Sequence, residues 1–134
     1  MACGVESESG SLHILFDAIP DSVPEARVRV RSWCEQAHVD CRIQGDLLLA
    51  VTEAAANVVR HAYPEGRPGT FSLDLRREAG DIVVVIGDEG VGMGAAASSP
   101  GGGLGLEIIR RLFPGVTFCQ ADPGTRITIR GHAG

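Results

Sequence analysis

The sequence predicts an α+β fold, a two-layer sandwich in which helices cover one face of a mixed, mostly antiparallel sheet. Residues 71–76 alternate apolar and polar side chains, which is typical of a half-buried strand. Residues 82–87 are almost continuously apolar, which indicates a central strand. The predicted order is strand, two helices, two strands, loop, helix and two strands. This order favours a layered α+β fold over the regular alternation of a Rossmann fold.

The first part of the chain is predicted to hold one strand and one helix after a loose arm at residues 1–10. Residues 11–18 contain a short apolar run and are expected to form the strand. The helix follows, because Ser22 fits an N-cap and Glu25 stands three residues later, at the spacing of a capping box. The buried stripe of this helix is expected at Ala26, Val30, Trp33 and Ala37.

A long helix is predicted over residues 47–63, with Asp46 as its cap and Pro64 at its end. Glu53 and Asn57 interrupt its apolar stripe and lie four residues apart, so they share a helix face. A carboxylate beside a carboxamide can coordinate a hard cation through oxygen, and the carboxylate can accept a proton. The plainer interpretation of the same pair is the solvated polar face of an amphipathic helix.

The second half of the chain is predicted to hold four strands and one helix. The strands are expected at residues 71–76, 82–87, 116–120 and 125–130, and the helix at residues 104–112. Turns that contain glycine separate the paired strands at residues 79–81 and 122–124.

Composition indicates one globular domain, placed at residues 11–134, and argues against several classes of function. The chain has 134 residues, 44% of them hydrophobic, which is enough for one core. Its net charge of −5 argues against direct binding of nucleic acid through phosphates. No apolar run reaches the roughly 18 residues of a membrane helix, and the N-terminus lacks a basic leader. We therefore expect no membrane contact, a cytoplasmic location and free thiols at all cysteines.

Two glycine-rich segments carry further candidate chemistry. Asp88 follows the central strand, where its carboxylate can accept a hydrogen bond from an exocyclic amine, and Gly90 and Gly92 would let a flat ring approach the backbone. Residues 100–106 lead into the last helix, whose first amides can bind an anion, although no Walker-type lysine follows. An acidic turn and a flexible loop are the plainer interpretations of these segments, and Gly124-Thr125 alone fits a plain turn.

In this order the segments resemble the four nucleotide-binding boxes of the GHKL ATPase superfamily. The boxes are E-x-x-x-N on a helix, D-x-G-x-G after a strand, G-x-G-L-G at a helix start and G-T before a last strand. The finer resemblance is to bacterial anti-sigma-factor serine kinases, and it rests on VTEAAANVVRHAY, IGDEGVGM and GGGLGLEIIRRL. The resemblance extends from about residue 11 to the C-terminus.

The resemblance implies a role for each matching residue. Asn57 would hold the magnesium ion that bridges the phosphates of ATP, and Glu53 would be the catalytic base that takes the proton of a partner's serine hydroxyl. Asp88 would read the adenine amine, supported by Thr125 through its hydroxyl or a water. The remaining nucleotide-binding residues would be Gly90 and Gly92 at the adenine floor, and Gly103, Leu104, Gly105 and Leu106 with their amides against the phosphates.

The function implied by the resemblance is an ATP-dependent protein-serine kinase and anti-sigma factor. It would phosphorylate an anti-sigma-factor antagonist and sequester a sigma factor. The resemblance and Trp33, a residue that suits an interface, also suggest a homodimer. The alternative is a non-catalytic nucleotide-binding or partner-binding switch module of the same fold. The lid between Met93 and Gly103 is short and uncharged. Magnesium, backbone amides or an arginine from elsewhere would therefore have to neutralise the negative charge of the transition state. The candidates are Arg60, Arg67, Arg110 and Arg126.

Overall fold

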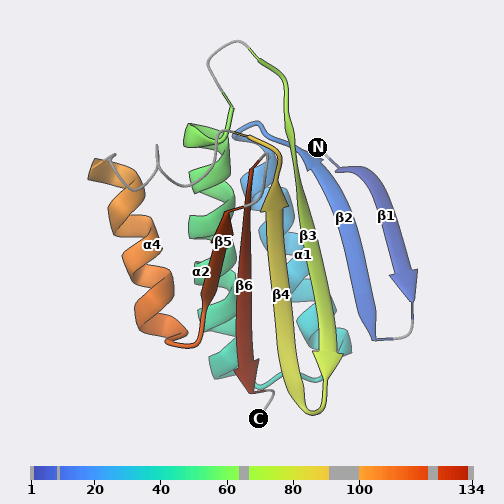
Figure 1. The fold of residues 1–134 in the computed structure, drawn as a ribbon. Coiled ribbons are helices and arrows are strands. Elements are labelled where there is room, and N and C mark those ends of the chain that lie inside the picture. Colours follow the sequence, from blue (N-terminus) through green and yellow to red (C-terminus); the bar gives the residue numbers. More distant parts are fainter. Residues whose placement is uncertain (1, 9, 64–66, 91–99, 121–123, 133–134) are drawn as a thin grey trace.

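An antiparallel sheet with helices on one face organises the protein (Figure 1). The computed structural model describes residues 2–8, 10–63, 67–90, 100–120 and 124–132. Within these ranges the strands are Ala2–Glu8 (β1), Ser11–Asp17 (β2), Thr70–Glu78 (β3), Asp81–Asp88 (β4), Thr117–Gln120 (β5) and Thr125–His132 (β6). The helices are Ser22–Gln36 (α1), Cys41–His61 (α2) and Pro100–Leu112 (α4). The α+β fold with helices on one face is therefore confirmed.

The sheet has six strands in the order β1-β2-β3-β4-β6-β5, and each of these described pairings is antiparallel. Ile14, Leu73, Ile86 and Ile127 lie opposite one another on successive strands and are all buried against the helices. Phe16 and Phe71 stack in the same layer, with ring centroids 5.2 Å apart. This shared apolar face fixes the register of the strands. The C-terminal end of β4 therefore lies beside the start of β6.

The expectation of a loose arm at residues 1–10 is wrong, because Ala2–Glu8 form the edge strand β1. The pairing of β1 with β2 runs as far as Glu8 opposite Ser11, which leaves a connection of two residues. Gly10 in this connection has a φ of +80°, as tight hairpin turns require. The polar sequence of residues 1–10 shows no strand pattern, because β1 is held by backbone pairing with β2.

Both helices before β3 begin earlier than predicted. Asp40 caps α2, since its side chain accepts a hydrogen bond of 2.9 Å from the backbone N–H of Arg42. The predicted connector at residues 41–45 is therefore the first turn of the helix. The N-cap of α1 is Asp21, one residue before the predicted cap at Ser22. The C-terminal half of α2, with Glu53 and Asn57, lies at the same end of the molecule as the C-terminal end of β4 and the start of β6 (Figure 1).

Cys34, Cys41 and Cys119 are free thiols. Cys34 is buried, which raises the pKa of its thiol to about 11, whereas Cys41 and Cys119 are exposed. Among the helices in the described ranges, none is both long and apolar enough to cross a membrane.

Candidate functional site

Asp88 lies at the C-terminal end of β4, where two backbone amides hold its carboxyl group. The N–H of Gly90 donates to Oδ1 over 2.9 Å. The amide of Thr125, which lies directly opposite on β6, donates a second hydrogen bond. Burial nevertheless raises the pKa of Asp88 above its ordinary value, despite these two bonds. A half-buried carboxyl group whose pKa is raised by burial is typical of a binding site.

Two glycines allow the backbone to close around Asp88. A Cβ on Gly90 would lie 1.8 Å from the carbonyl oxygen of Ala62, at the end of α2. A Cβ on Gly124 would lie 1.9 Å from the carbonyl oxygen of Asp88, and Gly124 has a φ of +100°. The absence of a side chain at Gly90 thus lets this turn pack against the C-cap of α2, and the approach of a flat ring stays a prediction. Gly92, the other predicted glycine of this segment, lies outside the described residues.

Glu53 and Asn57 share the face of α2 that turns toward α4. Asn57 is only 9% exposed, and its buried Oδ1 has no hydrogen-bond partner in the described part of the chain. Glu53 is half-buried, and a Cβ on Gly105 of α4 would lie 3.0 Å from its Oε2. A buried amide oxygen without a partner is not part of a solvated polar face. It fits a hard cation, for which amide and carboxylate oxygens are suitable ligands.

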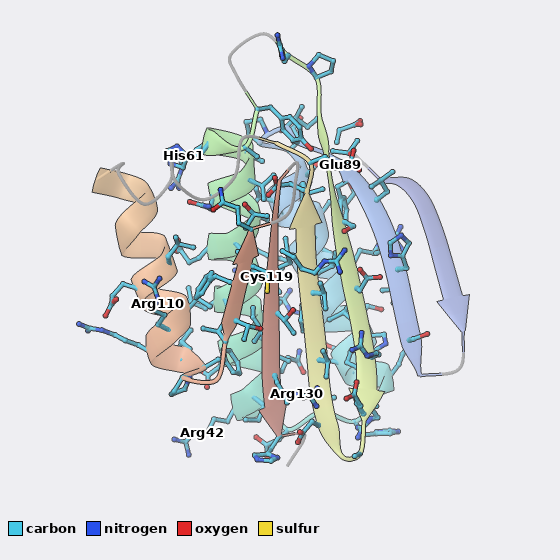
Figure 2. The ribbon with its side chains drawn as sticks, in the orientation of Figure 1. Arg42, His61, Glu89, Arg110, Cys119 and Arg130 are labelled. Atoms are coloured by element: carbon cyan, nitrogen blue, oxygen red, sulfur yellow. The ribbon has the colours of Figure 1, made fainter. Side chains whose placement is uncertain are left out.

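His61 belongs to the same face, one turn beyond Asn57. Its Nε2 is also buried without a hydrogen-bond partner among the described residues. Figure 2 shows His61 and Glu89 at the end of the molecule opposite Arg42. His61 was not among the predicted site residues. Its spacing of four residues from Asn57 and eight from Glu53 was the signal that it faces the site.

The glycine-rich segment enters α4 earlier than predicted. The helix starts at Pro100, so residues 101–103 form its first turn. The amides of Leu104, Gly105 and Leu106 lie beyond this turn and pair within the helix, and the Leu106 side chain is 2% exposed in the core. The expectation that the amides of this segment lie against phosphates stays a prediction. The unpaired donors belong to the glycines nearer the helix start, and Gly105 instead makes room for Glu53.

Known proteins resemble this chain in sequence and in fold. Residues 16–130 match the family model described as the histidine kinase-like ATPase domain. The chain belongs to this family. It is 27% identical to the serine/threonine-protein kinase BtrW of Bordetella bronchiseptica over 103 residues, which are 69% of this chain and 72% of that protein. It is 26% identical to the anti-sigma F factor of Bacillus velezensis over 133 residues, covering 90% of this chain and 91% of that protein.

Solved structures share the fold of this histidine kinase-like ATPase domain. The structure of the RsbU and RsbW domains of Rv1364c from Mycobacterium tuberculosis matches with a TM-score of 0.70 at 21% identity, over 91% of this chain and 32% of that longer chain. The histidine kinase domain of the Erythrobacter litoralis EL346 blue-light activated histidine kinase matches with a TM-score of 0.56 at 23% identity, over 67% of this chain and 44% of that chain. Both likenesses support the layered α+β fold.

The structure separates the four candidate arginines. Arg126 neighbours the buried Ile127 on β6, so its side chain lies on the sheet face away from the helices. The guanidinium of Arg110 lies over the ring of Phe118, 4.8 Å from its centroid, and so turns toward β5. Arg60, in the last turn of α2, and Arg67, before β3, are both exposed and stay as candidates.

Replacing Asp88 with asparagine is expected to raise the free energy of unfolding at neutral pH. Because burial raises the pKa of Asp88, the folded protein keeps this proton to a higher pH than the unfolded chain. Stability therefore falls as pH rises from the ordinary aspartate pKa through the raised one, and it stays lower above that window. Asparagine cannot ionise and keeps one oxygen to accept from Gly90.

Urea unfolding of both proteins across a pH series measures this effect. The gain of Asp88→Asn over wild type should be largest at neutral pH and should shrink as pH falls toward about 4, the ordinary aspartate value. A gain that is independent of pH, or a loss at neutral pH, would show that the buried carboxylate carries no ionisation cost.

Proposed function

We propose that this chain is an ATP-dependent protein-serine kinase that acts as an anti-sigma factor, with magnesium as its metal. The observation that carries the proposal is the buried Oδ1 of Asn57, which has no hydrogen-bond partner among the described residues, on the face of α2 where Glu53 lies against Gly105 of α4. A cation site next to a carboxylate and a helix N-terminus suits the binding and transfer of a phosphoryl group. The relatives named as a serine/threonine-protein kinase and an anti-sigma F factor support the same function.

In this proposal the adenine end of ATP lies at Asp88. Its carboxylate accepts a hydrogen bond from the exocyclic amine, while the amides of Gly90 and Thr125 hold the carboxylate in place. Asn57 supplies an oxygen ligand for magnesium, which neutralises phosphate charge when bound. Glycine amides in the first turn of α4 donate to the phosphates.

Glu53 is the proposed general base. Its carboxylate takes the proton from a serine hydroxyl of the partner as the serine oxygen attacks the γ-phosphorus. The bond from that phosphorus to the bridging oxygen breaks, and ADP leaves with the electron pair. Glu53 is half-buried on a rigid helix, and Gly105 leaves the space beside it that a side chain would fill. A non-catalytic switch module would have no need of a carboxylate at this place.

The proposed partners are an anti-sigma-factor antagonist, which carries the acceptor serine, and a sigma factor. The proposed setting is the cytoplasm, where both would meet this chain. A homodimer is part of the proposal only through the family resemblance. Trp33 does not support it, because this side chain is 8% exposed and belongs to the core cluster.

Replacing Asn57 with alanine is expected to remove the enhancement of ATP binding by magnesium. The variant loses the oxygen ligand but leaves Asp88 in place, so weak, magnesium-independent binding of the nucleotide should persist. The deleted amide oxygen has no hydrogen-bond partner among the described residues, so its loss breaks no bond that the structure describes. Calorimetric titration of ATP with and without magnesium checks this, with Gln44→Ala near the start of the same helix as the control. If Asn57→Ala kept the full magnesium effect, the metal assignment would be wrong.

The kinase itself is tested by incubating the chain with magnesium ATP and a purified anti-sigma-factor antagonist. Mass spectrometry should find phosphate on one serine of the antagonist, in amounts that grow with time and depend on this chain. Tight ATP binding without any transferred phosphate would instead favour the non-catalytic switch module.

A further inference from the structure

Tyr63 joins three segments that are distant in the sequence. It follows the C-cap residue of α2, and its hydroxyl donates to the backbone carbonyl of Thr70, at the start of β3, over 2.5 Å. The same oxygen accepts from the backbone N–H of Glu89, directly after β4, over 3.1 Å. A carbonyl can only accept and an amide N–H can only donate, so the direction of both bonds is fixed.

Close packing leaves this junction little freedom to shift. The backbone of Gly69 lies against the Tyr63 ring, where a Cβ would come within 2.3 Å of Cε2. The backbone of Gly90 lies against the carbonyl of Ala62, the residue before Tyr63. Glu89 is thus tied to Tyr63 through its amide, and the next residue is packed against α2. The turn after β4 therefore follows the end of α2.

That turn contains the group proposed to read adenine. Gly90 donates to Oδ1 of Asp88, and the amide of Glu89 lies between these two residues in the chain. Any displacement of the Glu89 amide would move the carboxylate and its donor relative to α2. We propose that Tyr63 is a positioning residue of the nucleotide site, whose hydroxyl sets the orientation in which Asp88 meets the base. This inference rests on the proposed function and adds a determinant of base specificity.

The test is the substitution Tyr63→Phe, which keeps the ring against Gly69 and deletes only the hydroxyl. Calorimetry compares ADP with inosine diphosphate, which carries a carbonyl in place of the exocyclic amine. The wild type should prefer ADP, and the preference should fall by about tenfold in the variant, because Asp88 no longer meets the amine in a fixed geometry. The melting temperature should fall by no more than a few degrees, because water can reach the exposed Glu89 amide.

Ser72→Ala is the matched control. Its hydroxyl also bonds to the backbone next to Asp88, at the carbonyl of Gly87 over 3.4 Å, but it comes from β3. The control should keep the wild-type preference for ADP. Amide hydrogen exchange gives an independent readout, in which Glu89 should exchange faster in Tyr63→Phe and at the wild-type rate in Ser72→Ala.

The experiment distinguishes a failure of the positioning role of Tyr63 from a failure of the proposed function. If Tyr63→Phe kept the wild-type preference for ADP, or weakened both nucleotides equally, the positioning role would be overturned while the proposed function stood. If the wild-type chain bound neither nucleotide, the proposed function would fail and this inference would fail with it.

Discussion

Replacing Glu53 with glutamine is expected to slow phosphoryl transfer by roughly 10²–10⁴-fold, while the affinity for ATP changes by no more than a few-fold. Glutamine has nearly the same shape but cannot accept the proton of the attacking hydroxyl. Ground-state binding should survive, because the proposed contacts to adenine and magnesium come from Asp88 and Asn57. Single-turnover transfer to an antagonist protein, together with calorimetric titration of ATP, measures the two effects separately.

Glu107→Gln provides the control for this experiment. Glu107 is an exposed carboxylate on α4 that pairs with Arg110 at 3.9 Å and Arg111 at 3.5 Å. Its removal should leave transfer unchanged, because exposed ion pairs contribute little and this one lies on the surface of the helix. Normal transfer by Glu53→Gln would show that another group acts as the base.

Replacing Gly90 with alanine is expected to lower the free energy of unfolding by at least about 3 kcal/mol and to abolish nucleotide binding. The added Cβ would lie 1.8 Å from the carbonyl oxygen of Ala62, which belongs to the main chain at the C-cap of α2 and cannot rotate away like a side chain. The turn after β4 must then separate from α2, which breaks the hydrogen bond from Gly90 to Asp88. Urea unfolding and ADP titration measure the two losses.

Gly45→Ala is the matched control, because Gly45 lies inside α2 and a Cβ there would meet nothing within 4 Å. That substitution should stabilise the protein by about 0.5–1 kcal/mol through helix propensity and should leave nucleotide binding unchanged. If Gly90→Ala were as stable as Gly45→Ala, the close packing of this turn against α2 would be contradicted.

Much of the fold could be predicted because its elements are periodic. The apolar run of β4, the alternation in β3 and the helical stripe of α2 each reflect the burial of one face or two. The first residues of the elements were harder to predict. Asp40 was not predicted as the cap of α2. The polar sequence of Ala2–Glu8 does not indicate a strand, because that strand depends on pairing with β2.

The candidate site could be predicted in part for a related reason. Glu53 and Asn57 lie on one helix, so their spacing shows that they are neighbours. The opposition of Asp88 and Thr125 depends on strand register, and only the family resemblance suggested it. The bonds of Tyr63 depend on the meeting of three distant segments, and no local pattern reports such a meeting.

We propose that this chain holds magnesium ATP between Asp88 and Asn57. The most direct test of this proposal is calorimetric titration of the purified chain with ATP in the presence and absence of magnesium. The proposed site predicts saturable binding that magnesium strengthens, because the buried oxygen of Asn57 then gains a partner. No binding of ATP or ADP at millimolar concentration would contradict the claim and would leave a partner-binding module with this fold.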